Sequence, residues 1–129
     1  MPLKNKTQSK QFNILCFLCD PSISHILAHS FSNITNSFIP FNISLSNTPP
    51  LSHQTIAIID NDLSEKEKRI FFNYIKKQHP PTKTLLALSK NYISPLSSHL
   101  PNHIDGIIYK PFNIEELSHT IQNIAQHLS

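Results

Sequence analysis

The sequence of 129 residues contains one glycine, no tryptophan and no valine, against ten prolines. A phosphate-binding loop built on several glycines is excluded, because Gly106 is the only glycine in the chain. Collagen-like chains and Gly/Ser-rich linkers are excluded for the same reason. With 39% hydrophobic and 15% charged residues, the composition is that of a globular chain. This length gives one domain with room for one well-packed core.

Acidic residues are few, and the excess of basic ones gives a net charge of +3 and a pI near 9.0. Three of the lysines lie in a polar segment at the start, so we expect residues 1–11 to form a flexible basic tail before a domain at 12–129. No basic run is interleaved with aromatic residues, which is the pattern that single-strand binding needs. We therefore expect neither a nucleic-acid partner nor a basic recognition surface.

Cysteine is also scarce, and the two residues present, Cys16 and Cys19, form a CxxC inside the apolar run 14–19. A redox-active CxxC begins a helix, whereas this run has the pattern of a buried strand. Residues three apart on a strand point to opposite faces, so we expect two reduced thiols in the core or a pocket. No stretch is long enough for a membrane helix, and we expect a cytoplasmic protein without a membrane partner.

Four short apolar runs lack the alternation of a strand with one solvated face. They cover residues 14–19, 56–59, 84–88 and 107–109. Such runs are typical of strands buried on both faces of a parallel sheet. A fifth segment, 38–43, contains Pro40, which has no N–H for a strand ladder, so we expect it at an edge of the sheet.

Helical patterns lie between these runs. Asp20 and Pro21 suit the N-cap and first position of a helix, whose apolar face comprises Ile23, Ile26, Leu27, Phe31 and Ile34. A capping box at residues 64–67 opens a second helix that ends before Pro80 and Pro81. The residues that this helix turns inward are Ile70, Phe71, Tyr74 and Ile75.

Asn113 suits the N-cap of a last helix that runs to the end of the chain. The apolar positions of this helix are Ile114, Leu117, Ile121, Ile124 and Leu128. Residues 91–103 are a weaker helical pattern interrupted by prolines, and 46–50 are so poor in helix formers that the helix after the edge strand is short or missing. Together these elements predict an α/β fold, a doubly wound (flavodoxin-like) five-stranded parallel sheet with right-handed crossovers.

Polar residues follow the predicted strands where each one ends. They are Cys19 and Asp20, then Asp60, then Ser89, then Lys110. In sheets of this kind the functional site lies at the carboxyl ends of the strands. A carboxylate can accept a phosphoryl group, a hydroxyl can bond its oxygens, and a lysine can neutralise its charge. The pattern predicts a phosphoryl-transfer site.

Residues 56–63, 85–89 and, above all, 105–117 (Asp-Gly-Ile-Ile-Tyr-Lys-Pro-Phe-Asn-Ile-Glu-Glu-Leu) resemble the receiver domain of bacterial response regulators (the CheY-like superfamily). The resemblance extends over 12–129 and implies the strand order 2-1-3-4-5. It implies Asp60 as phosphoacceptor, Ser89 as switch hydroxyl and Lys110 as the phosphate-contacting lysine. It also implies that Asp62 gives its backbone carbonyl to a magnesium ion.

The chain departs from the receiver pattern at the end of the first strand. The two adjacent acids that hold magnesium in receivers are replaced by Leu18 and Cys19, of which the first is no ligand and the second a soft one. A register shifted by one residue brings in Asp20, whose other role is the helix cap. Asp20, Asp60 and Asp62 are then a weak metal set, and magnesium binding is doubtful. The switch aromatic of receivers is replaced by Ile107.

These departures predict a pseudo-receiver, a non-enzymatic module of a two-component or phosphorelay system that acts through protein–protein contacts. The alternative is a working receiver that a histidine kinase phosphorylates on Asp60. The expected partner is a histidine kinase, an output protein or a second copy, the last through Leu96, Ile107, Tyr109 and the helix 114–128. A flavin site is disfavoured because residues 19–22 make a poor phosphate cradle. Histidine pairs at 25/29 and 99/103 lack a third ligand for zinc.

Overall fold

The computed structural model describes residues 12–44, 54–78, 82–89 and 104–126. The strands are β1 (Phe12–Phe17), β2 (Ser37–Pro40), β3 (Gln54–Asp60), β4 (Lys83–Ser89) and β5 (Gly106–Lys110), and the helices are α2 (Pro21–Ser30), α3 (Glu65–Lys76) and α4 (Ile114–Ala125). The predictions for residues 1–11, 46–50, 80–81, 91–103 and Leu128 lie outside these ranges. No helix within them combines the length and apolarity that a membrane crossing requires.

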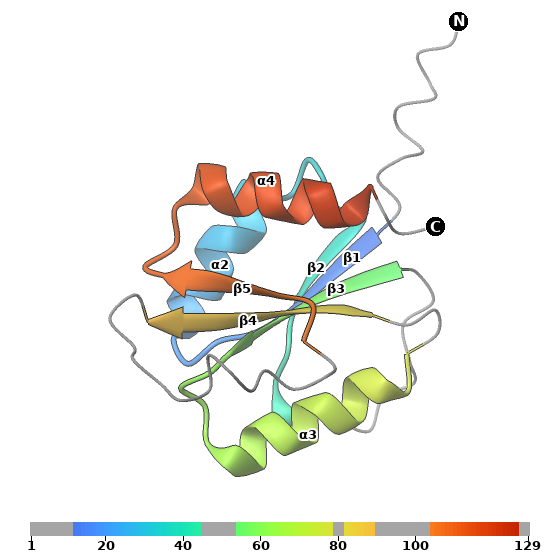
Figure 1. Ribbon diagram of the computed structural model, residues 1–129, viewed down its shortest axis with the longest axis vertical. Helices are drawn as coiled ribbons and strands as arrows, with labels where there is room; N and C mark the ends of the chain where they lie inside the picture. The colour runs from blue at the N-terminus through green and yellow to red at the C-terminus, as the bar shows by residue number, and fades with distance from the viewer. Residues whose placement is uncertain (1–11, 45–53, 79–81, 90–103, 127–129) are drawn as a thin grey trace, which may run out of the picture.

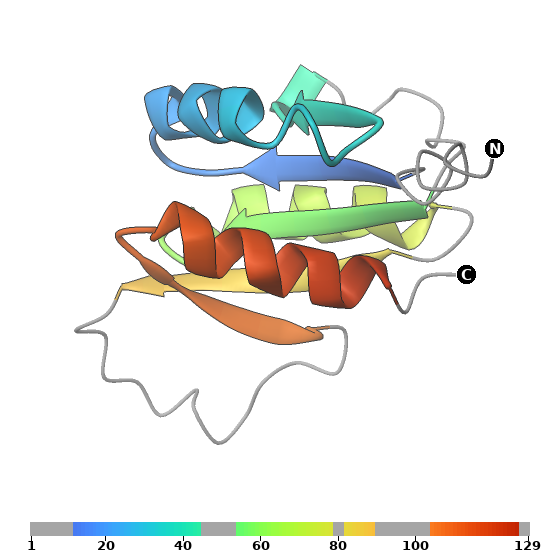
Figure 2. The same cartoon turned by 90° about the horizontal axis from the view of Figure 1, so that it is seen from above.

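The strands form one parallel sheet in the order β2-β1-β3-β4-β5, which confirms the predicted fold class. Helices α2 and α4 cover one face of this sheet and α3 covers the other (Figures 1 and 2). β2 lies at an edge, as Pro40 predicts. Pro40 pairs with Cys16 at the end of the strand, and the next N–H, of Phe41, donates to the Cys16 carbonyl at 2.8 Å. Pro40 itself donates no hydrogen bond, but the backbone bonding between the two segments resumes at the next residue.

Each face of the sheet has its own core, because successive side chains of a strand point to opposite sides. On β3, Ile56 and Ile58 join the cluster beneath α2 and α4, while Ala57 and Ile59 join the cluster beneath α3. All four are fully buried. This is why the strand sequences show no polar alternation.

The three helices begin where the sequence predicts. The Asp20 carboxylate accepts from the Ser22 N–H at 3.0 Å, and Asn113 accepts from the Glu116 N–H at 3.0 Å. Ser64 and Glu67 form both bonds of the capping box, each at 3.1 Å. Side-chain caps satisfy N–H groups that the first turn of a helix leaves free, so these local signals define the helix starts independently of the core.

The first strand begins and ends two residues earlier than predicted, and this changes the position of Cys19. β1 ends at Phe17 because the Cys19 N–H donates to the Asp60 carboxylate and Asp20 begins the helix cap, so the chain leaves the sheet there. Cys19 is therefore exposed and is not a core residue, although both cysteines are free, as expected. Cys16 is buried, and burial raises the pKa of its thiol to about 12 against the opposing effect of a hydrogen bond from Ser24.

Gly106 begins β5 directly opposite Leu85 of β4. A Cβ atom at this position would lie 3.0 Å from Leu85 Cδ2. The only glycine of the chain therefore stands where the backbone of β5 approaches a core side chain too closely for any other residue to fit without a shift.

Candidate functional site

Asp60, Ser89 and Lys110 are the last residues of three neighbouring strands, β3, β4 and β5. Ser89 pairs with Lys110, and Asp60 pairs with Ala87. Two residues before each of them, Ile58, Ala87 and Ile108 all face the α2/α4 core, so strand alternation directs the three polar side chains to that same face. The structure thus brings these three predicted site residues to one rim of the sheet.

The Asp60 carboxylate is buried, with 2% of the residue exposed, and three donors hold it. Lys110 Nζ lies 2.7 Å from Oδ1, and the Asp62 N–H donates to the same oxygen at 3.0 Å. The Cys19 N–H donates to Oδ2 at 3.1 Å. A carboxylate has about four acceptor positions, so most of the acceptor capacity of Asp60 is already used within the chain.

The charged forms of Asp60 and Lys110 stabilise each other. Burial acts to raise the pKa of Asp60, but the hydrogen bonds from Lys110, Asp62 and Cys19 outweigh it and hold that pKa below its ordinary value. Burial acts to lower the pKa of Lys110, and the bonds to Asp60 and Asp62 outweigh it in the same way, so that this pKa is raised. The pair is ionised at neutral pH and behaves as one unit.

Asp62 takes part through its side chain, which sequence reasoning did not anticipate. Its Oδ2 lies 2.8 Å from Lys110 Nζ, so the lysine joins two carboxylates. The loop that carries Asp62 is fixed by the Asn61 N–H, which donates to the Ala87 carbonyl at 2.9 Å, and by Lys68 Nζ, 3.1 Å from the Asn61 carbonyl. The sequence feature that could have indicated this second ion pair is the spacing of Asp60 and Asp62 around Asn61, together with Lys110 at the end of another strand.

The end of β1 offers no set of oxygen ligands for magnesium. Leu18 is buried and has no ligand atom, and Cys19 contributes its backbone N–H to Asp60. Asp20 turns back onto the first turn of α2, where Ser22 donates to it through the backbone and the hydroxyl, and these bonds lower the pKa of Asp20. Within the described ranges no group of three or more His, Cys, Asp or Glu residues is placed to hold a metal ion. Asp20, Asp60 and Asp62 therefore do not fit a magnesium site as they stand.

Ile107 lies on β5 opposite Leu86, where it is half-buried. Its neighbour Ile108 faces the α2/α4 core, so Ile107 points to the α3 side of the sheet. Tyr109 is 51% exposed. Both belong to the predicted contact surface, of whose other members the helix residues 114–126 are described, while Leu96 and Leu128 lie outside the described residues. That surface stays a prediction.

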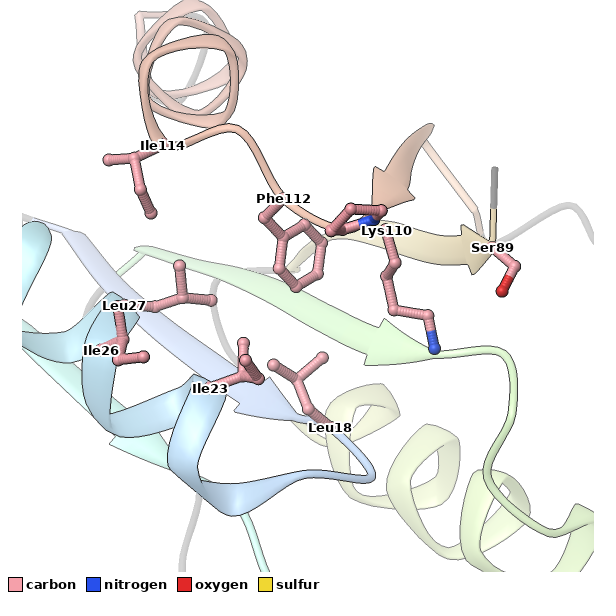
Figure 3. A pocket seen from close by; sticks show the side chains of 9 residues that line it. Leu18, Ile23, Ile26, Leu27, Ser89, Lys110, Phe112 and Ile114 are labelled. Carbon is pink, nitrogen blue, oxygen red and sulfur yellow. The ribbon is translucent and has the colours of Figure 1, made fainter. Parts of the chain in front are cut away.

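An open hollow of about 520 Å³ lies beside the ion pair, between α2, the end of β5 and the start of α4 (Figure 3). Seven of the nine residues that line it are apolar, and the other two are Ser89 and Lys110. Ile26 of α2 lines the hollow and is 55% exposed, so the prediction that it faces the core is wrong. Of the other predicted core positions, Leu27 and Phe31 are buried, and Ile23 and Ile34 are half-buried and pack against the same core.

No protein-family model matches the sequence, and no curated protein matches it. Solved structures do match the fold. The N-terminal signal receiver domain of a two-component system response regulator from Bacteroides fragilis superposes with a TM-score of 0.68 and 16% identity, over 92% of this chain and 99% of that one.

Two further structures extend this comparison. NtrX from Brucella abortus in complex with ADP has a TM-score of 0.65 and 18% identity over 88% of this chain, which spans 26% of the NtrX chain. The pilus assembly protein CpaE from Caulobacter crescentus CB15 has a TM-score of 0.59 and 10% identity, over 87% of this chain and 98% of that one. The chain has the fold of response regulator receiver domains, and a pilus assembly protein shares that fold.

Proposed function

We propose that the chain is a pseudo-receiver, a signalling module of a two-component or phosphorelay type system that acts by binding another protein and depends little on phosphorylation. The observation that carries this proposal is the state of the Asp60 carboxylate. Lys110 and two backbone N–H groups occupy it, and within the described ranges no group of three or more His, Cys, Asp or Glu residues is placed to hold a metal ion beside it.

The missing metal site has a direct chemical consequence. An incoming phosphoryl group carries negative charge, and positioning plus neutralisation of that charge supply most of the catalysis of its transfer. Among the described residues, Lys110 is the cation that contacts Asp60, and its charge is already shared between Asp60 and Asp62. Asp60 therefore lacks the electrostatic help that a phosphoacceptor needs, and the module works as a binding partner, not as an enzyme.

A specific observation favours the alternative, a working receiver phosphorylated on Asp60 by a histidine kinase. Asp60, Ser89 and Lys110 lie at adjacent strand ends on one face, which is the arrangement that the receiver resemblance implies for acceptor, switch hydroxyl and lysine. The two functions differ in one measurable property, the stoichiometry of modification at Asp60.

The deciding experiment treats the protein with acetyl phosphate, and separately with beryllofluoride, in the presence of magnesium. Intact-mass spectrometry counts added phosphoryl groups, and ¹⁹F NMR detects bound beryllofluoride. We expect neither to reach stoichiometry. Stoichiometric addition in the native chain that is lost in Asp60→Asn would overturn the pseudo-receiver and establish the alternative.

A gain-of-function variant tests whether the lack of a magnesium site explains the expected low phosphorylation of Asp60. Cys19→Asp places a carboxylate beside Asp60 at an exposed position, where its own solvation cost is small. We expect this variant to bind magnesium measurably tighter than the native chain by titration calorimetry. Ser30→Asp, at the exposed far end of α2, is the matched control and should leave magnesium binding unchanged.

A further inference from the structure

We propose that the hollow between α2 and the start of α4 binds a neutral, mainly apolar small molecule that carries one oxygen acceptor, such as a medium-chain alcohol or a carbonyl compound. The proposal does not depend on the phosphorylation state of Asp60. It rests on the size of the hollow, the arrangement of its lining and the charge at its polar end.

The size and lining are those of a ligand site. Small-molecule sites are concave, about 300–1,000 Å³ in volume, and mainly apolar with a few placed polar groups. This hollow has a volume of about 520 Å³ and two polar residues among nine. Figure 3 shows its two ends: Ile26, Leu27 and Ile114 line one, while Lys110 and Ser89 lie at the other.

The apolar end leaves hydrophobic surface in water. Ile26 is 55% exposed and Ile114 is 37% exposed, and both line the hollow from different helices. An apolar ligand body placed between them would remove this surface from water, at about 25 cal/mol per Å² of apolar area. Leu18, Ile23 and Phe112 line the middle and continue the apolar wall toward the lysine.

The polar end selects for a neutral ligand. An ammonium group has three N–H donors, and Lys110 gives two of them to Asp60 and Asp62. The third is suited to one acceptor oxygen of a ligand, and the Ser89 hydroxyl is the other polar group that lines the hollow. Lys110, Asp60 and Asp62 together carry a formal charge of −1. A ligand carboxylate would therefore be repelled by the two aspartates and is disfavoured.

The test compares 1-octanol with octanoate, a pair that shares its apolar chain and differs in the charge of its head group. Two-dimensional NMR of the isoleucine methyl groups locates binding in the native chain. We expect 1-octanol to shift Ile23, Ile26 and Ile114, and octanoate to bind about tenfold more weakly because of the two carboxylates. Absence of octanol shifts at these methyl groups, or equal binding of octanoate, overturns the proposal.

A variant and its control give an independent measurement. Ile26→Glu places a carboxylate in the apolar wall of the hollow, and the native side chain is already exposed, so the fold should tolerate it. Ile43→Glu is the matched control, since Ile43 is 43% exposed and does not line the hollow. We expect the fluorescence of the neutral probe N-phenyl-1-naphthylamine to fall severalfold in Ile26→Glu only. An equal loss in both variants overturns the site, as does sedimentation showing that Ile26→Glu merely dissociates a dimer formed by this surface.

Discussion

The two faces of the sheet differ in what fills them and in what they leave open. The face beneath α3 is closed by an aromatic cluster, in which the Phe41 ring lies 5.0 Å from Phe17, 4.9 Å from Phe71 and 5.3 Å from Tyr74, between centroids. The face beneath α2 and α4 is mainly aliphatic and opens into the hollow at the carboxyl ends of the strands.

The polar site lies at the rim of the second face. Strand alternation sends Asp60, Ser89 and Lys110 to the α2/α4 side, where the hollow begins. The aromatic cluster on the other face, in contrast, is closed by ring packing. The comparison teaches that the polar site and the hollow lie at the rim of the aliphatic face, where a ligand could bind without opening the aromatic cluster.

The largest expected effect is on the aromatic face. Phe71→Ala removes a fully buried ring that contacts Phe17 and Phe41, and should cost about 3–5 kcal/mol of unfolding free energy. Urea denaturation followed by circular dichroism measures this loss. The control Phe72→Ala removes a half-buried ring of the same helix and should cost clearly less. Equal losses would show that the aromatic face is not a closed core.

A middle-sized effect is expected at the ion pair. Lys110→Met leaves the buried Asp60 carboxylate with two backbone donors only, and should cost about 1–3 kcal/mol because a buried acceptor loses its charged partner. The control Lys66→Met changes an exposed lysine of α3 and should stay within about 0.5 kcal/mol. A Lys110→Met variant as stable as this control would show that the pair adds nothing to the fold.

The pH dependence of stability follows from the same pair. The pKa of Asp60 is held below its ordinary value, so its contribution is complete above the unfolded-state pKa of about 3.9 and is lost as pH falls through the folded-state pKa. The pKa of Lys110 is raised above 10.5, so its contribution disappears as pH rises through that raised value. The free energy of unfolding can be measured by denaturation of the native chain and of Lys110→Met at successive pH values. We expect it to fall less in the variant than in the native chain at both low and high pH.

The smallest expected effect concerns Asp20 at the start of α2. Asp20→Ala should cost about 1 kcal/mol through loss of the cap, a loss comparable to that of Ser64→Ala at the start of α3. Magnesium affinity, measured by calorimetry, should be the same in both variants. A fall confined to Asp20→Ala would show that this carboxylate leaves the cap to bind the ion.

The sequence predicted the order of the elements well because each signal was local. The capping box at Ser64 and the cap at Asn113 fix helix starts through bonds to the nearest turn. The end of β1 was misplaced because Leu18 and Cys19 prolong an apolar run, and apolarity does not show where a strand leaves its sheet. What ends it is the bond from Cys19 to Asp60, a contact across 41 positions of the chain.

The site was predictable in its members and less so in its connections. Asp60, Ser89 and Lys110 could be placed together because parallel strands end at one rim. The second ion pair of Lys110, with Asp62, depends on the loop conformation after β3, which Asn61 and Lys68 set through backbone contacts. Ile26 was assigned to the core because helical periodicity shows on which face of a helix a residue lies. It does not show whether another element covers the residue on that face.

The modification rates of the two free thiols, Cys16 in the first strand and Cys19 just after it, can measure how often the sheet opens. Thiolate is the reactive form of cysteine. Burial raises the pKa of Cys16 to about 12 and keeps its thiol from reagents. Partial burial and the neighbouring Asp60 also raise the pKa of Cys19, but this thiol is exposed just beyond the strand end. An alkylating reagent therefore reaches Cys19 in the folded chain and reaches Cys16 only when β1 separates from its neighbours. The lag between the first and the second modification reports how often the centre of this sheet comes apart.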